Sequence, residues 1–248
     1  MADNTKPTRQ RLDKVLVHLG VGSRSQVQKL VRQGKVTVNG DAILDPSQSI
    51  EPEGSTFVVD GYTMIYSTFV YYMLHKPPGL VSASRGEEVV LDLVQAADKR
   101  PGLFPVGRLD KDTEGLLLLT NDGQLAHRLL APKRHVPKRY VLRYEGELDA
   151  RAVDIFAEGM LLEDGDRCLP AELLLHESTA EGSWATVILH EGKFHQVKRM
   201  IAMVGGLVVY LQRVAFGPLQ LDPALASGTY RPLTEEEIAA LQKAAISS

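Results

Sequence analysis

The chain has 248 residues, of which 44% are hydrophobic and 24% charged, so it is long enough for one large core or two unequal ones. It contains no run of eighteen apolar residues, and the N-terminal segment lacks the apolar part of a secretion signal, so we expect a cytoplasmic protein without a membrane contact. The single cysteine, Cys168, argues against a disulfide framework or a cysteine metal cluster and is expected to be a small packing residue.

The net formal charge of −3 is distributed unevenly. Residues 1–40 contain eight Lys and Arg against two Asp, a formal charge of +6, so residues 41–248 carry −9. A basic segment on an otherwise acidic protein is a candidate for binding a polyanion.

Two short helices and a hairpin are predicted in the first forty residues. Apolar residues recur at helical spacing over residues 11–19 and again over residues 24–33, where Ser23 stands at the N-cap position. A strand at 36–38 runs into Asn39-Gly40, a dipeptide typical of tight hairpin turns. These elements predict an independent unit of about fifty to sixty residues.

The rest of the chain predicts a larger domain that begins after a connection near residues 61–68, so we expect domains at residues 1–62, including an N-terminal tail, and 63–248. Strands are expected at 69–74, 116–120, 140–144, 184–190 and 207–211. Helices are expected at 124–130, 150–159, 194–204 and, behind a capping box at Thr234–Glu237, through Leu241. The irregular order of these elements favours an α+β fold with a mixed, mainly antiparallel sheet and flanking helices.

A polar loop within residues 107–123 is enclosed by apolar runs, which hold its carboxylates at fixed positions. The spacing of Asp110, Asp112, Glu114 and Asp122 lacks the alternation and central glycine of a calcium loop, so we expect no metal. Asp122 precedes a helix and is explained as its cap. Asp110 has no such structural explanation and is therefore a candidate reactive group.

Two further segments carry charge next to predicted elements. Residues 191–200, EGKFHQVKRM, place three cations near the start of a helix, where anions bind favourably. Lys138-Arg139-Tyr140 places an aromatic ring at the start of a strand behind two cations. Taken alone, Tyr140 is better explained as a strand aromatic in the core, and only its combination with Asp110 and Lys198 favours a role in the site.

The first domain resembles an S4 domain, a small RNA-binding module. The similarity covers about residues 9–60, through RLDKVL and SRSQVQKLVRQGKVTVNG. It implies that the second helix and its flanking loop lie against RNA, with these residues as phosphate contacts: Arg24, Lys29, Arg32 and Lys35. The alternative is that these cations simply solvate a helix face.

The whole chain resembles the pseudouridine synthases of the RsuA/RluB/RluE/RluF group, which join an S4 domain to a catalytic domain with the pseudouridine synthase fold. Five motifs occur in the family order: KPPG, GRLDKDTEGLLLLTNDG, KRYVL, GKFHQVKRM and YRPLTEEEI. The resemblance implies that Asp110 is the catalytic aspartate, Tyr140 the active-site tyrosine and Lys198 the basic partner of the aspartate. It also implies RNA contacts by Arg108, Lys76, His195 and Arg199. Arg139 and His75 depart from the family's usual Thr and Asn and leave only local RNA contacts in doubt.

Isomerisation of uridine to pseudouridine conserves atoms, so the resemblance implies a reaction without a cofactor. The base must leave its stack before a protein group can reach it. A lysine about 4 Å from Asp110 would contribute on the order of 4 kcal/mol at an effective dielectric near 20, which favours the ionised carboxylate. Whether that carboxylate attacks the sugar, attacks the base or removes a ribose proton stays open.

The finer wording of the last two motifs resembles the members that modify 16S rRNA, so we expect a monomer acting on small-subunit ribosomal RNA, free or within an assembling subunit. The alternatives are a large-subunit 23S rRNA synthase of the same family, a non-catalytic RNA-binding protein built on the S4 module, and a metal-dependent hydrolase.

Overall fold

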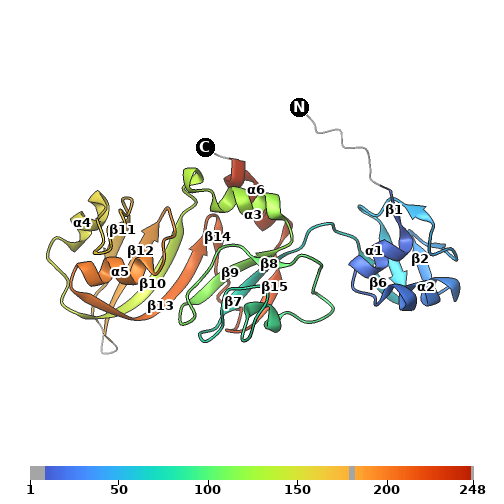
Figure 1. Ribbon diagram of the computed structural model, residues 1–248, viewed down its shortest axis with the longest axis horizontal. Coiled ribbons are helices and arrows are strands. Elements are labelled where there is room, and N and C mark those ends of the chain that lie inside the picture. Colours follow the sequence, from blue (N-terminus) through green and yellow to red (C-terminus); the bar gives the residue numbers. More distant parts are fainter. Residues whose placement is uncertain (1–8, 179–181, 247–248) are drawn as a thin grey trace. The chain divides into compact units, whose positions relative to one another are not determined.

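In the computed structural model, which describes residues 9–178 and 182–246, the chain divides into two units (Figure 1). The first comprises residues up to Val70 together with 94–103, and the second comprises 71–93 and 104–248. The expected boundary at residue 62 therefore lies too early, because residues 62–65 form a strand of the first unit's sheet and Tyr66 is buried in its core. The predicted tail at residues 1–8 lies outside the described residues.

The first unit contains the two predicted helices and the hairpin. Its elements are β1 (Gln10–Arg11), α1 (Leu12–His18), α2 (Arg24–Arg32), β2 (Val36–Val38), β3 (Asp41–Ala42), β4 (Ser49–Ile50), β5 (Thr56–Val59) and β6 (Tyr62–Ile65). Four strands form a sheet in the order β3-β2-β5-β6, and β1 pairs with β4. Ser23 caps α2 through a capping box with Gln26. Asn39 and Gly40 both adopt positive φ in the turn between β2 and β3, as the hairpin prediction requires.

The apolar faces of α1 and α2 bury their side chains in one core with the sheet. This leaves the cations of α2 on the opposite, exposed face. Asp13 is fully buried beneath that face, where it accepts hydrogen bonds from Arg11, Arg24 and Gln28. The hydrogen bond from Arg11, the largest cause, holds the pKa of Asp13 well below its usual range. A buried carboxylate thus fixes one of the predicted RNA contacts from below.

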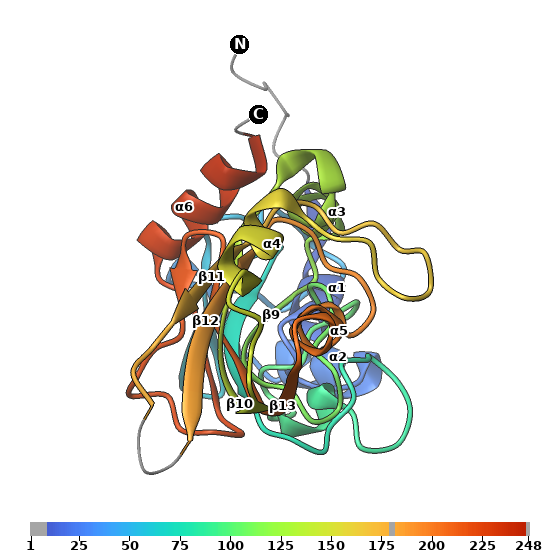
Figure 2. The same ribbon diagram turned by 90° about the vertical axis from the view of Figure 1, so that its left-hand side faces the viewer.

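The second unit is built on a nine-stranded sheet of the described residues, with the central order β11-β12-β10-β13-β9-β7-β15 (Figures 1 and 2). Its strands are β7 (Tyr71–Lys76), β8 (Phe104–Pro105), β9 (Glu114–Thr120), β10 (Lys138–Gly146), β11 (Glu172–Leu175), β12 (Ser183–Leu189), β13 (Gly206–Phe216), β14 (Leu219–Gln220) and β15 (Tyr230–Pro232). All pairs are antiparallel except β13 with β9. The mixed, mainly antiparallel sheet confirms the predicted architecture.

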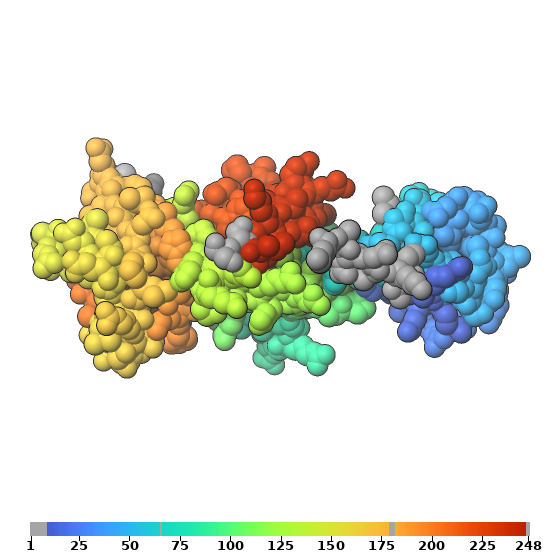
Figure 3. Space-filling model, turned by 90° about the horizontal axis from the view of Figure 1, so that it is seen from above, coloured from blue at the N-terminus to red at the C-terminus, as the bar shows by residue number. Residues whose placement is uncertain are grey.

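Helices flank this sheet. They are the short 3₁₀ turns η1 (Val90–Leu93) and η2 (Pro132–Arg134) and the helices α3 (Gly123–Leu130), α4 (Ala152–Glu158), α5 (Gln196–Met203) and α6 (Glu235–Ile246). α3 and α6 lie side by side on the surface of this unit (Figure 3), and their apolar residues share one core with β9. None of the helices in residues 9–178 and 182–246 is long and apolar enough to cross a membrane.

Three local predictions in this unit are confirmed. The Asp122 carboxylate accepts a hydrogen bond from the amide of Leu125 and so caps α3. Thr234 and Glu237 form the capping box that opens α6. Cys168 is buried.

Gly115 is required where β9 meets β13. Its φ is +104°, and a Cβ at this position would collide with the backbone of Arg213. The glycine therefore allows the parallel pairing of β9 and β13, which brings the polar loop before β9 next to side chains of β13.

Candidate active site

A cavity of about 580 Å³ opens in the second unit. Most of its lining comes from the loop at residues 107–113, strand β10, the turn at 192–197 that leads into α5, and strand β13, and Val81, Leu130 and Leu189 complete it. The structure thus brings together Asp110, Tyr140, Arg108 and His195, which were predicted as site residues from three separate motifs.

Asp110 lies at the wall of this cavity, with its side chain 27% exposed. The loop turns sharply after it, because the amide of Thr113 donates to the Asp110 carbonyl. Asp110 Oδ1 is 3.6 Å from His195 Nε2. His195 itself adopts a positive φ of 48°, a backbone conformation that side chains with a Cβ rarely adopt, at the start of α5. A carboxylate that is close to the cavity and only partly solvated suits a reactive group.

Lys76 stabilises the loop that carries Asp110 through hydrogen bonds to backbone carbonyls. It is fully buried, and its ammonium group donates to the carbonyls of Pro77, Lys111 and Thr113 at 3.0, 3.1 and 2.9 Å. Burial, opposed by the charges of nearby carboxylates, lowers the pKa of Lys76 to about 8. The predicted RNA contact is wrong for this residue, because no part of it reaches the surface. It fixes the backbone on both sides of Asp112 instead.

Lys198 does not pair with Asp110. Its ammonium group lies 2.6 Å from both carboxylate oxygens of Asp112, and this hydrogen bond is the main cause that lowers the pKa of Asp112. The expected ion pair with Asp110 is therefore wrong. Lys198, in the first turn of α5, meets the exposed Asp112, and His195, the residue before α5, lies near Asp110.

Arg199 also differs from its prediction. Its guanidinium pairs with Asp164 and Asp166 and donates to the carbonyl of Phe194. It does not line the cavity. We assign it a structural role, because these contacts hold the turn before α5 in place of the predicted RNA contact.

Tyr140 occupies the cavity wall on β10 and is 9% exposed. Its register partner on β13 is Arg213, so the two side chains share one face of the sheet. The Tyr140 side chain therefore lies at the wall of the same cavity as the Asp110 carboxylate.

Two buried cations were not predicted as site residues: Lys138, which the sequence analysis noted only as a charge before Tyr140, and Arg213. Both line the cavity, with relative exposures of 9% and 2%. Lys138 Nζ donates to the carbonyl of Val136 at 2.8 Å, and Arg213 Nε donates to the carbonyl of Leu116 at 2.9 Å. The available signals were the position of Lys138 two residues before Tyr140 on one strand and a lone arginine inside the largely apolar β13.

The mouth of the cavity is more polar and exposed. Arg108 is exposed there. Lys111 pairs with Glu88 at 2.7 Å. Phe194 is 74% exposed and stacks on the ring of His195, with ring centroids 3.8 Å apart. Such a rim, with cations and an exposed aromatic ring, is typical of surfaces that hold single-stranded nucleic acid.

In the first unit the four predicted RNA contacts are all exposed. Arg24 is oriented by Asp13 at 3.1 Å, and Lys35 pairs with Asp60 at 2.9 Å. Since these cations lie on one surface helix and the loop after it, the arrangement can follow a phosphate backbone.

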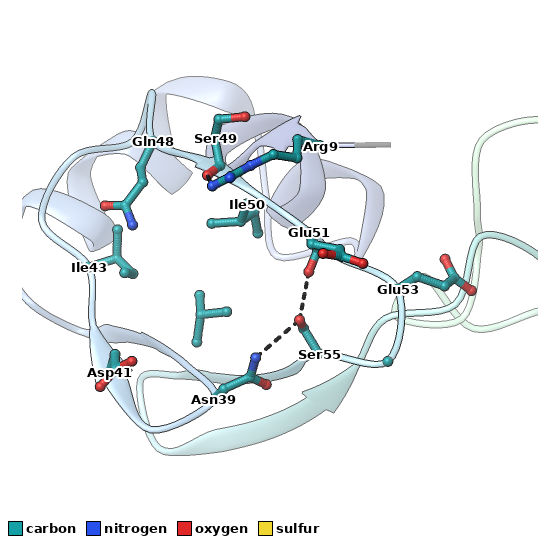
Figure 4. Close-up of a pocket in the computed structure, with 12 residues that line it drawn as sticks. Arg9, Asn39, Asp41, Ile43, Gln48, Ser49, Ile50, Glu51, Glu53 and Ser55 are labelled. Atoms are coloured by element: carbon teal, nitrogen blue, oxygen red, sulfur yellow. Dashed lines mark hydrogen bonds between the residues drawn. The ribbon is translucent and has the colours of Figure 1, made fainter. Parts of the chain in front are cut away.

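The first unit has a second cavity, of about 430 Å³ (Figure 4). Asn39 donates to the hydroxyl of Ser55, which donates in turn to the carbonyl of Glu51. The cavity is open, and its charged groups include the carboxylates of Asp41 and Glu53. Acidic groups repel phosphate, so this cavity is not a candidate site for RNA chemistry. Across the described part of the chain, no group of three or more His, Cys, Asp or Glu is arranged to hold a metal ion.

Comparisons with known proteins agree with this arrangement. Residues 70–203 match the family model of RNA pseudouridylate synthases, and residues 10–54 match that of S4 domains. The chain is 43% identical over 230 residues to a Bacillus subtilis protein named as an uncharacterized RNA pseudouridine synthase, covering 92% of this chain and 96% of the relative. It is 39% identical over 231 residues to ribosomal small subunit pseudouridine synthase A of Pseudomonas aeruginosa, with 92% and 98% covered.

Another relative, ribosomal large subunit pseudouridine synthase B of Bacillus subtilis, is 36% identical over 238 residues, covering 94% of this chain and 96% of the relative. A crystal structure of a pseudouridylate synthase superimposes with a TM-score of 0.63 at 34% identity, covering 93% of this chain and 99% of that one. The chain therefore belongs to the RNA pseudouridine synthase family and joins an S4 domain to the catalytic domain.

Proposed function

We propose that this protein converts one uridine of 16S ribosomal RNA to pseudouridine, with Asp110 as its catalytic carboxylate. The single observation that carries the proposal is one cavity that is lined by both Asp110 and Tyr140 and has exposed cations and an aromatic ring at its rim. The volume of about 580 Å³ accommodates one extruded nucleoside.

Each residue of the site has a role that follows from its position. The carboxylate of Asp110 acts at the ribose or at the base, and Tyr140 stacks on the uracil ring. The Tyr140 hydroxyl is also the candidate group to help remove the C5 proton in the last step. Lys198, held by Asp112, places a positive charge beside the loop that carries Asp110. Arg108 and His195 hold the RNA at the mouth of the cavity, and the S4 domain adds phosphate contacts through the cations of α2.

The small-subunit assignment is supported by the 39% identity to the Pseudomonas aeruginosa enzyme and by the wording of the last two sequence motifs. The 36% identity to a large-subunit enzyme supports 23S rRNA as the second candidate. The test uses purified protein with uridine-5-tritiated 16S and 23S rRNA made by transcription, both free and in partly assembled subunits. Tritium release from 16S alone supports the proposal, and release from 23S alone contradicts it.

The S4 cations are expected to set the salt dependence of RNA binding. Changing Arg24, Arg32 and Lys35 together to Ala removes up to three phosphate contacts, so the slope of log K against log salt becomes shallower by about 2 to 3. The measurement is a filter-binding titration with rRNA between low and physiological salt.

A charge-matched control changes three exposed cations of the second unit to Ala: Lys133, Arg151 and Lys243. This control should leave the slope within about one unit of wild type. Equal slopes for the S4 variant and the unmodified protein would show that the S4 surface does not bind the RNA backbone.

A further inference from the structure

Lys138 and Arg213 are two positive charges buried in the cavity wall without a counter-ion. Neither forms an ion pair with a carboxylate of the described residues. Arg213 Nη2 has no hydrogen-bond partner there either, although it is buried. Glu191 is the acidic group that most affects Lys138, but its carboxylate accepts hydrogen bonds from the amide of Leu169 and from Gln196.

The two cations are also close to each other. Both lie over the ring of Phe216, Lys138 Nζ at 5.7 Å and the Arg213 guanidinium at 5.2 Å from its centroid. Burial first, and the charge of Arg213 second, lower the pKa of Lys138 to about 8. An uncompensated buried charge is costly, and an unsatisfied buried donor is rare in folded proteins. The missing partner is therefore expected to come from the substrate that fills the cavity.

The position of the pair selects the part of the substrate that it meets. Lys138 and Tyr140 are two residues apart on β10 and so lie on the same face of the sheet, and Arg213 is the register partner of Tyr140 on β13. All three buried side chains therefore line the same wall of the cavity, where Tyr140 is the stacking surface for the base. The exposed cation Arg108 lies at the mouth, where the phosphates of an RNA chain stay in solvent. An extruded nucleotide enters base first, so the inner cations meet the uracil ring rather than a phosphate.

We propose that Lys138 and Arg213 are catalytic residues that bind the carbonyl oxygens of the extruded uracil and stabilise the negative charge that the ring carries once it is detached from the ribose. The inference rests on the proposed function, because it assumes that the target uridine reacts in this cavity.

The electron count of the reaction requires such stabilisation. When the bond from ribose C1′ to N1 breaks, its electron pair stays on the base, and the charge is shared by N1, O2 and O4. Asp110 takes part in one of three ways: it bonds to C1′ and leaves again, it removes the C2′ proton and returns it, or it adds to C6 of the base and is expelled once C5 has bonded to C1′. C5 then bonds to C1′, the C5 proton leaves and N1 gains a proton. Fixed donors aimed at a developing oxyanion are among the largest contributions to catalysis.

The test is a cycle of protein and substrate changes. The RNA is the shortest fragment of rRNA that the wild-type protein modifies, synthesised with uridine, 2-thiouridine or 4-thiouridine at the target. Sulfur accepts hydrogen bonds poorly, so replacing the contacted oxygen should slow the wild-type protein. Single-turnover rates are followed by nucleoside chromatography. Arg213→Gln and Lys138→Met are each expected to slow the uridine reaction by about 10- to 100-fold, with RNA affinity unchanged.

With at least one thio-substrate, the decrease in rate that sulfur causes in the wild-type protein should be absent in Arg213→Gln or in Lys138→Met. The variant has already lost the hydrogen bond to that oxygen, so sulfur has nothing further to remove. If the rate decrease from the protein change and that from the sulfur multiply in every pair of variant and substrate, the inference is overturned and the cations contact a phosphate instead. Arg139→Met is the matched control, since Arg139 is exposed on the same strand and does not line the cavity, and it should react at the wild-type rate. Inactivity of the wild-type protein on all rRNA would instead refute the proposed function.

Chemical rescue guards against misfolding of the variants. Added guanidinium should restore part of the rate of a smaller variant, Arg213→Ala, if the buried charge is what the reaction lacks. A folded, RNA-binding Arg213→Ala that guanidinium does not rescue, together with wild-type rates for Arg213→Gln, would also overturn the inference.

Discussion

Changing Asp110 to Asn is expected to abolish pseudouridine formation while the protein still folds and binds RNA. The amide has the shape of the carboxylate but can neither bond to the sugar nor accept a proton, so we expect a rate loss of roughly four orders of magnitude. Asp110 is partly exposed and is not a cap or a buried ion pair, so the fold does not depend on its charge. Because product and substrate have equal mass, the measurement is tritium release from C5-labelled uridine or carbodiimide labelling with primer extension.

The matched control is Asp112→Asn, which makes the same change two residues later in the same loop. The Asp112 side chain is 72% exposed and contacts Lys198. Surface ion pairs contribute at most about 1 kcal/mol, and this pair is open to solvent on the Asp112 side, so the variant should lose less than about tenfold in rate. Residual turnover in Asp110→Asn close to that of Asp112→Asn would refute the assignment of Asp110.

Changing Lys76 to Met is expected to lower kcat by about 100-fold with a much smaller effect on stability. Without the ammonium group, the carbonyls of Pro77, Lys111 and Thr113 lose their donor, and the loop that positions Asp110 can shift by an ångström or more. Stability responds less because two effects oppose each other. Unsatisfied carbonyls are destabilising, but removal of a buried charge is stabilising.

The sign of that second effect follows from the pKa of Lys76. Burial lowers it from 10.5 to about 8, so the charged form costs stability at every pH below about 8, and the cost disappears as the pH rises towards 10.5. We expect a net change in the free energy of unfolding within about 2 kcal/mol at pH 7. Lys133→Met, which removes an exposed cation of the same unit away from the cavity, is the control and should stay near wild type in both measurements.

Denaturant titration and single-turnover kinetics separate these two quantities. A Lys76→Met protein that reacts at the wild-type rate would show that the buried ammonium group does not position the loop.

The elements that the sequence predicts well are those fixed by local chemistry. The capping boxes at Ser23 and Thr234, the cap at Asp122 and the Asn39-Gly40 turn each depend on neighbours within four residues, and the structure confirms them. The family motifs also identify three separate segments that the fold brings to one cavity.

The predictions that are wrong all depend on contacts between distant residues. The domain boundary is too early because the pairing of β6 with β5 has no local signature. Lys76 in a Lys-Pro-Pro-Gly loop resembles an exposed cation until its three carbonyl partners are known. Whether Lys198 pairs with Asp110 or with Asp112 depends on where α5 lies relative to the loop, which the sequence does not show.

Arg213 illustrates the same limit in the opposite direction. Arg213 is a charged residue within a largely apolar strand, and the sequence pattern does not indicate whether its side chain is exposed or buried. Only the parallel pairing at Gly115 and the register with Tyr140 show that it faces the cavity. The chemistry of the site therefore depends on the topology of the sheet as much as on the motifs.

The most direct test of the central claim is a map of pseudouridines across all ribosomal RNA in cells that lack this protein, by carbodiimide labelling and primer extension. The account predicts that one modified uridine, in 16S rRNA, is absent and returns when the wild-type gene is supplied but not with Asp110→Asn. An unchanged map, or restoration of the site by the Asp110→Asn protein, would contradict it.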